Sequence, residues 1–131
     1  MSKGHHQHQL RHQGLSMFGK DLTRRSGACC ELCEASGVGL SVYEVPPIPA
    51  DPDFEHCIFI CDTCRDQIDH PKRRVGDHWR CLGKSIWSSV PAVQAISVKL
   101  LSQLQTDWSA ELLETLYLEP EVEAWVDQME L

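Results

Sequence analysis

The sequence predicts a small α+β protein in which a β-hairpin module is followed by a C-terminal subdomain of three helices. Two C-x-x-C pairs flank two short runs rich in β-branched and aromatic residues, and such runs favour strands. After residue 86, apolar residues recur at helical spacing. The chain of 131 residues is long enough for one compact domain, or for a small module with an appendage.

Composition divides the chain into three regions. Residues 1–19 begin with MSKGHHQHQLRHQG, which is His-rich and polar and has no apolar periodicity, so we expect a disordered tail. Residues 20–85 contain all seven cysteines and are expected to form the hairpin module, and residues 86–131 the amphipathic helical subdomain. Hydrophobic patterning starts at Met17, a candidate for the natural start, and MFGKDLTRRSGA predicts a short helix ending near Ser26 and Gly27.

Two runs within the module predict the hairpin. These are LSVYEV at residues 40–45 and CIFI at residues 57–60. The connection PPIPADPDFEH is rich in proline, which cannot donate to a sheet, so we expect a long loop. CDTCRDQIDHP then predicts a short helix with Asp62 and Thr63 in its first turn and Pro71 at its end. The pattern of residues 72–87 assigns them to no single element.

Three amphipathic helices are expected after this segment. Ser88 or Ser89 is the expected cap of the first helix, and Pro91 is tolerated in its first turn. The second begins near Asp107, and Pro120 opens the third. The apolar positions predicted to form their buried faces are Val93, Ile96, Leu100, Leu101, Leu104, Trp108, Leu112, Leu113, Leu116, Val122, Trp125, Val126 and Met129. We expect these faces to cover one another and the cysteine module, with a groove on a partner as the alternative.

The net charge of −7 is unevenly distributed. Residues 1–28 carry five Lys/Arg and one acid, residues 29–85 carry six and ten, and residues 86–131 carry one and eight. An acidic C-terminal third is a poor surface for nucleic-acid phosphates and is typical of solvated helices. No apolar stretch approaches the roughly 20 residues of a membrane span. An odd cysteine count without a signal-peptide pattern predicts a cytoplasmic protein with reduced thiols.

The two cysteine pairs predict a zinc site. CELC and CDTC are separated by 27 residues, and each two-residue gap lets a tight turn present two thiolates to one tetrahedral Zn²⁺. The first pair precedes the hairpin and the second opens a helix, which is the order of a zinc-ribbon or treble-clef module. A redox dithiol and reduced core cysteines are the alternatives, and the βαβ unit of a thioredoxin-like protein is missing. The predicted metal ligands are Cys30, Cys33, Cys61 and Cys64.

Three cysteines remain outside this set. Cys29 is a surplus neighbour that could replace Cys30 in a C-x3-C arrangement, and Cys57 is expected in the core. Cys81 and His78 have ligand-like spacing, but a second pair of ligands is lacking. We therefore predict one metal ion.

The sequence around the cysteines resembles the N-terminal zinc-ribbon region of the proteobacterial PhnA family. The motifs RRSGACCELCEA, LSVYEVPP, ICDTCRDQI, DHWRCL, IWSSVPAVQ and LLETLYLE occur in the family's order over residues 20–127. The resemblance implies metal cysteines at Cys30, Cys33, Cys61 and Cys64 and a link to alkylphosphonate uptake genes, without an established biochemical role. Many members continue into a basic C-terminal β-domain, which this sequence lacks after Leu131.

The sequence favours a non-enzymatic module. Phosphonate hydrolysis, which the name PhnA suggests, needs an open metal site, whereas four thiolates make a closed one. An HNH-type treble-clef nuclease needs a histidine on the first hairpin strand, where LSVYEVPP has none. At best the chain is a degenerate relative of such nucleases. His56, His70 and His78 lie elsewhere, and no catalytic residue is predicted.

Nucleic-acid binding is a further alternative. Trp79 and Trp87 lie close in sequence to the basic run Lys72-Arg73-Arg74, and aromatic and basic residues together can bind single strands. We favour a core position for both tryptophans and expect the module to act through an unidentified protein partner.

Overall fold

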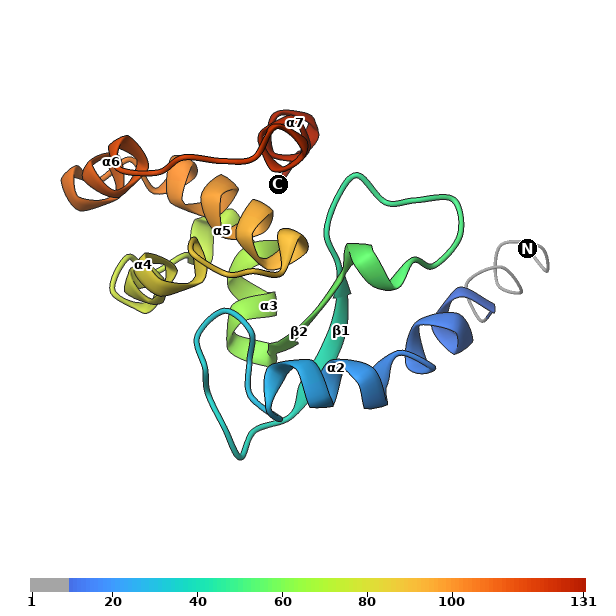
Figure 1. Ribbon diagram of the computed structural model, residues 1–131. Coiled ribbons are helices and arrows are strands. Elements are labelled where there is room, and N and C mark those ends of the chain that lie inside the picture. Colours follow the sequence, from blue (N-terminus) through green and yellow to red (C-terminus); the bar gives the residue numbers. More distant parts are fainter. Residues whose placement is uncertain (1–9) are drawn as a thin grey trace.

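The computed structural model describes residues 10–131 and has an α+β architecture. Its two-stranded antiparallel sheet pairs β1 (Leu40–Glu44) with β2 (Cys57–Cys61). Figure 1 shows this hairpin between helix α2 (Gly19–Ser26) and the helices that follow it in the chain. The predicted α+β class and the predicted hairpin are therefore confirmed.

The N-terminal segment differs in part from the expected disordered tail. Residues 10–16 are helical, and residues 1–9 of that tail lie outside the described part of the chain. Arg11 anchors this segment, because its guanidinium pairs with the Glu44 carboxylate and donates to the carbonyls of Pro49 (2.8 Å) and Ala50 (3.0 Å). The polar composition gave no sign of these long-range contacts.

Helix α2 ends where the sequence predicted. Gly27 adopts a left-handed conformation (φ 67°), and the N–H of Ala28 donates to the carbonyl of Thr23 (2.9 Å). Glycine adopts positive φ without the steric cost that a Cβ atom imposes. The chain thereby turns into the first cysteine pair.

One 3-10 turn lies in the loop of the hairpin, and two more 3-10 turns and two helices follow β2. The 3-10 turn η1 (Phe54–His56) precedes β2, and the Asp53 side chain caps it by accepting the N–H of Glu55 (2.9 Å). Helix α3 (Asp62–Asp69) follows β2 directly, as predicted. The segment that the sequence pattern left unassigned contains η2 (Pro71–Arg73), η3 (His78–Cys81) and α4 (Leu82–Ser85).

The three C-terminal helices form close to their predicted positions. They are α5 (Pro91–Leu104), α6 (Asp107–Glu114) and α7 (Pro120–Gln128). The expected serine cap of α5 was wrong, because Val90 occupies the cap position and Ser88 Oγ accepts the Val90 N–H (3.1 Å) instead. Within residues 10–131, no helix has the length and apolar character needed to cross a membrane.

One continuous core joins the hairpin module to these helices. Helix α5 packs against α4, α6 and α7 and also contacts β2 and η1. Trp125 of α7 donates its indole N–H to the carbonyl of Pro46 in the hairpin loop (2.9 Å). The buried cluster extends from Cys30 to Met129, so the boundary expected at residues 85 and 86 is not a break in packing. The C-terminal helices cover the cysteine module, as expected from the sequence, rather than leaving their apolar faces for a groove on a partner.

Trp79 is central to this core, which leads to a prediction. Its side chain is 0% exposed, whereas Trp87, eight positions later, is 56% exposed, so the expected core position is confirmed for Trp79 and wrong for Trp87. We expect Trp79→Ala to lower the free energy of unfolding by about 3–5 kcal/mol, because it leaves a large cavity. Trp87→Ala is the matched control and should change it by about 0.5 kcal/mol or less. Urea unfolding followed by circular dichroism measures both, and equal losses would contradict this core.

Candidate metal centre

The first cysteine pair lies in a tight turn closed by backbone hydrogen bonds. The Cys30 N–H donates to the carbonyl of Ala35 (3.0 Å), and the Glu34 N–H donates to the carbonyl of Cys30 (2.9 Å). Within the turn, the Cys33 N–H points at Cys30 Sγ (3.5 Å). The two-residue gap therefore places both thiols on the same side of the turn, and one backbone amide already faces a sulfur atom.

The second pair spans the junction of β2 and α3. Cys61 is the last residue of β2 and the N-cap of α3, and Cys64 lies in the first turn of that helix. The positive end of a helix dipole favours negative charge at this position. Both side chains are buried, at 5% and 0% exposure.

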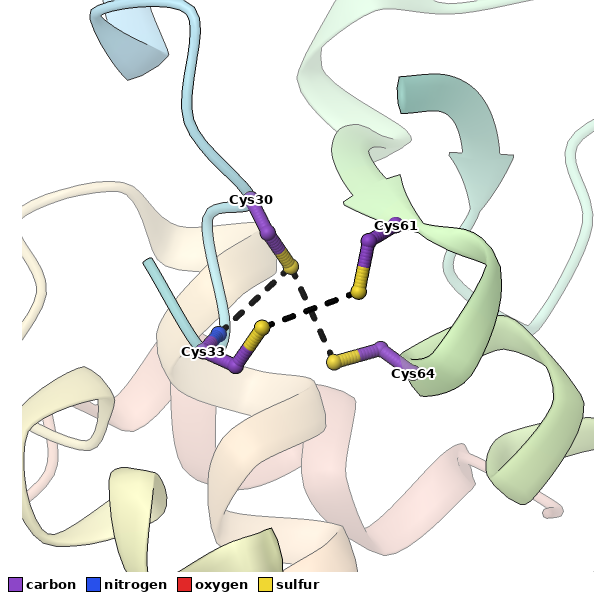
Figure 2. Close-up of side chains that lie close together, drawn as sticks. All are labelled: Cys30, Cys33, Cys61 and Cys64. Atoms are coloured by element: carbon purple, nitrogen blue, oxygen red, sulfur yellow. Dashed lines mark hydrogen bonds between the residues drawn. The ribbon is translucent and has the colours of Figure 1, made fainter. Parts of the chain in front are cut away.

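The fold brings the four predicted ligands together. All four sulfur atoms lie within 4.8 Å of one another. Cys33 Sγ is 3.6 Å from Cys61 Sγ, and Cys30 Sγ is 3.7 Å from Cys64 Sγ. Figure 2 shows the four side chains converging on a common centre from the turn on one side and from β2 and α3 on the other.

These distances fit one tetrahedral metal ion. Zn–S bonds of about 2.3 Å in a regular tetrahedron place neighbouring sulfur atoms about 3.8 Å apart. The close pairs differ from that value by only 0.1–0.2 Å at 3.7 and 3.6 Å, without a disulfide between any of the cysteines. The group can therefore hold a metal ion in its present arrangement.

The electrostatics of the site favour a bound cation. The hydrogen bond with Cys64 lowers the pKa of Cys30, and backbone amides add to this effect against the cost of burial. That same hydrogen bond, followed by burial and the nearby thiolates, raises the pKa of Cys64. Burial also raises the pKa of Cys33. Four thiolates cannot coexist here without a positive charge, because each ionised sulfur opposes ionisation of the next.

Glu31, inside the first pair, fixes the turn to the hairpin. Its carboxylate accepts hydrogen bonds from Arg25 Nε (2.9 Å) and Nη2 (2.8 Å) and from the N–H of Phe59 (2.8 Å). Its own N–H donates to the carbonyl of Phe59 (2.8 Å). Arg25 also donates to the carbonyl of Cys57 (2.8 Å). This network ties α2, the turn and β2 together beside the sulfur atoms, and sequence analysis missed it because spacing gives no sign of it.

The remaining three cysteines lie outside the four-cysteine set. Cys29 is half-buried and its Sγ is 3.4 Å from the carbonyl of Gly27. Cys57 is buried, and burial raises its pKa to about 11. Burial and the nearby thiolates of Cys33 and Cys30 raise the pKa of Cys81 to about 12. Among residues 10–131, the four-cysteine set is the one group of three or more clustered ligands, so His78 and Cys81 do not form a second group.

One side of the site opens onto a cavity of about 740 Å³. Two of the four cysteines, Cys33 and Cys61, line it, together with His78 and Cys81. Cys33 is the half-buried member of the four, whereas the others are buried. Access to the sulfur atoms is therefore from this side.

Comparison of the chain with protein-family models, curated proteins and solved structures found no significant match. The geometry of the site is therefore the basis of its interpretation.

The network around Glu31 leads to a second prediction. Glu31→Gln removes the charge that Arg25 binds, and the Glu31 side chain is only 6% exposed. We expect a loss of about 1–3 kcal/mol in the free energy of unfolding. Glu34→Gln is the control, because Glu34 pairs with Lys84 (2.8 Å) on the surface and should contribute no more than about 1 kcal/mol. Similar effects of both variants in urea unfolding would contradict a stabilising role for the network of Arg25 and Glu31.

Proposed function

We propose that this chain is a zinc-binding protein in which Cys30, Cys33, Cys61 and Cys64 hold one Zn²⁺ that stabilises the fold. The observation that supports this most directly is the gathering of four sulfur atoms within 4.8 Å. Thiolates in a tetrahedral set favour zinc or iron, and two C-x-x-C turns are typical of structural zinc sites. The zinc-ribbon or treble-clef arrangement and the relation to PhnA proteins belong to the same proposal and rest on the motifs quoted above.

A structural role is favoured over a catalytic one. Catalytic zinc keeps a coordination position for water or substrate, whereas four cysteines fill all four positions. The thiolates also come from a turn, a strand and a helix, so one ion links segments that are far apart in the sequence. Zinc bound here would contribute directly to folding.

Two of the histidines considered for an HNH-type nuclease, His56 and His70, have other partners. His56 packs on Trp125 (4.6 Å between ring centroids), and His70 Nδ1 is 3.2 Å from the Asp66 carboxylate on the surface. Strand β1 carries Glu44, which pairs with Arg11, and no histidine. These contacts support a non-enzymatic role.

A protein partner is favoured over a nucleic acid. Trp79 is buried and cannot stack on a base. Binding of a nucleic-acid strand, which relied on Trp79 and Trp87, therefore has one tryptophan fewer to use. Arg73 binds Asp66 (2.7 Å), and Arg74 donates to the carbonyls of Gln67 (2.9 Å) and Ile68 (3.1 Å). Arg74 is therefore committed to the fold, and Arg73 is engaged in a surface ion pair.

Exposed aromatic side chains support the choice of a protein partner. Trp87 and Tyr117 are 56% and 82% exposed, and both types are enriched at protein interfaces. We accordingly propose an interaction module.

Metal content and folding test the proposal together. Native mass spectrometry should find one zinc per chain, and chelation or Cys61→Ser should unfold at least residues 27–70, because a structural zinc contributes roughly 10 kcal/mol or more to such modules. Cys29→Ser, next to the site, is the control and should keep the metal and the fold. A Cys61→Ser protein with unchanged zinc content and melting temperature would show that these sulfur atoms are not the ligands.

A nicking assay tests the absence of nuclease activity. We expect plasmid DNA to stay intact with the zinc-loaded protein and added Mg²⁺ or Mn²⁺, because no histidine lies on β1. Metal-dependent nicking that His78→Ala abolishes would instead favour the HNH-type alternative.

A further inference from the structure

We propose that His78 is a fifth residue of the metal site, whose Nε2–H donates a hydrogen bond to the metal-bound thiolate of Cys64. This inference rests on the proposed zinc site and assigns a role to a residue outside the two cysteine pairs. His78 would stabilise one ligand without contacting the metal ion itself.

The geometry places the imidazole at the required position. Nε2 of His78 lies 3.3 Å from Cys64 Sγ, within the range of hydrogen bonds to sulfur. The residue begins η3, where Trp79 is fully buried in the core. The two rings are perpendicular, at 82° with centroids 4.8 Å apart. The buried tryptophan therefore fixes the turn from which the imidazole reaches the site.

Cys64 is a ligand without a backbone donor in the described part of the chain. Cys30 receives the backbone N–H of Cys33, whereas the cysteine contacts of Cys61 Sγ and Cys64 Sγ are with Cys33 Sγ and Cys30 Sγ. Within residues 10–131, the hydrogen bonds of Cys64 Sγ are with Cys30 Sγ and with His78 Nε2. Once a metal ion displaces the thiol protons, no hydrogen is left between Cys30 Sγ and Cys64 Sγ. His78 then remains as the donor to a thiolate that is 0% exposed.

The charge of the loaded site explains what this hydrogen bond would do. Four thiolates around a divalent cation leave a net charge of −2, which is costly in a buried place unless N–H groups disperse it. An uncharged imidazole can donate through Nε2–H when its other nitrogen carries no proton. The hydrogen bond lowers the energy of the Cys64 lone pairs, and it makes protonation of the thiolate, and hence metal loss, less favourable.

His78 also lies where it can restrict access. Its side chain lines the cavity beside the site together with Cys33 and Cys61. Loss of the imidazole would therefore weaken one ligand and widen the approach to it at the same time. A variant that keeps the ring but loses the donor separates these two effects.

Three variants of the full chain test the inference. His78→Phe keeps an aromatic ring and removes the donor, whereas His78→Gln supplies an amide N–H in place of Nε2. His70→Phe is the matched control, because His70 is exposed and contacts Asp66 rather than a cysteine. Each protein is loaded with Zn²⁺ for chelator competition and with Co²⁺ for absorption spectra, and circular dichroism checks its fold.

We expect His78→Phe to release zinc to the chelator roughly 10- to 100-fold faster, the size of effect typical of residues that support metal ligands. The thiolate-to-cobalt charge-transfer band should move to lower energy, because the lone pairs of Cys64 lose their stabilising hydrogen bond. His78→Gln should recover most of both changes, and His70→Phe should match the wild type.

Two results would overturn the inference while leaving the zinc site intact. One is a His78→Phe protein whose zinc release and charge-transfer band equal those of the wild type. The other is a change in the cobalt ligand-field bands that indicates loss of a nitrogen ligand, which would make His78 a ligand rather than a donor. Failure of the wild-type protein to bind metal would overturn the proposed function and this inference together, and it is seen before any variant is compared.

Discussion

The structure depends on the meeting of four cysteine sulfur atoms at the junction of a turn, a strand and a helix. Their spacing, within 4.8 Å, requires two segments 27 residues apart in sequence to stay in register. Thiols at this distance oppose one another's ionisation, so the arrangement is most stable when a cation is bound. The clamp between Arg25 and Glu31 holds the turn against β2 and thereby presents the first pair to the second.

The site is also part of the hydrophobic core. Cys30, Cys61 and Cys64 belong to the same buried cluster as the apolar side chains of α5. Because packing is continuous from the thiols to Met129, we expect a change at the cysteine cluster to reach the C-terminal helices through direct contacts. A metal ion bound by these cysteines would therefore stabilise both the hairpin module and the helical region that covers it.

Much of this arrangement could be predicted from local patterns. C-x-x-C spacing identified the cysteines that the fold gathers. Runs of β-branched and aromatic residues placed the hairpin, and helical periodicity placed the three C-terminal helices. What the sequence could not show depends on contacts between distant residues. The helical residues 10–16 are held by the ion pair between Arg11 and Glu44. In the segment of short turns at residues 71–85, Trp79 is fully buried in the core. Glu31 and the approach of His78 to Cys64 have no periodicity of their own, although the ligand-like spacing of His78 and Cys81 was a partial signal.

The central claim is that four sulfur atoms, and no other atoms, coordinate one metal ion. X-ray absorption at the zinc edge of the loaded protein measures this directly, because sulfur and nitrogen or oxygen neighbours differ in scattering and in bond length. We expect four sulfur scatterers at about 2.3 Å. A first coordination sphere that contains nitrogen or oxygen at about 2.0–2.1 Å would contradict the account.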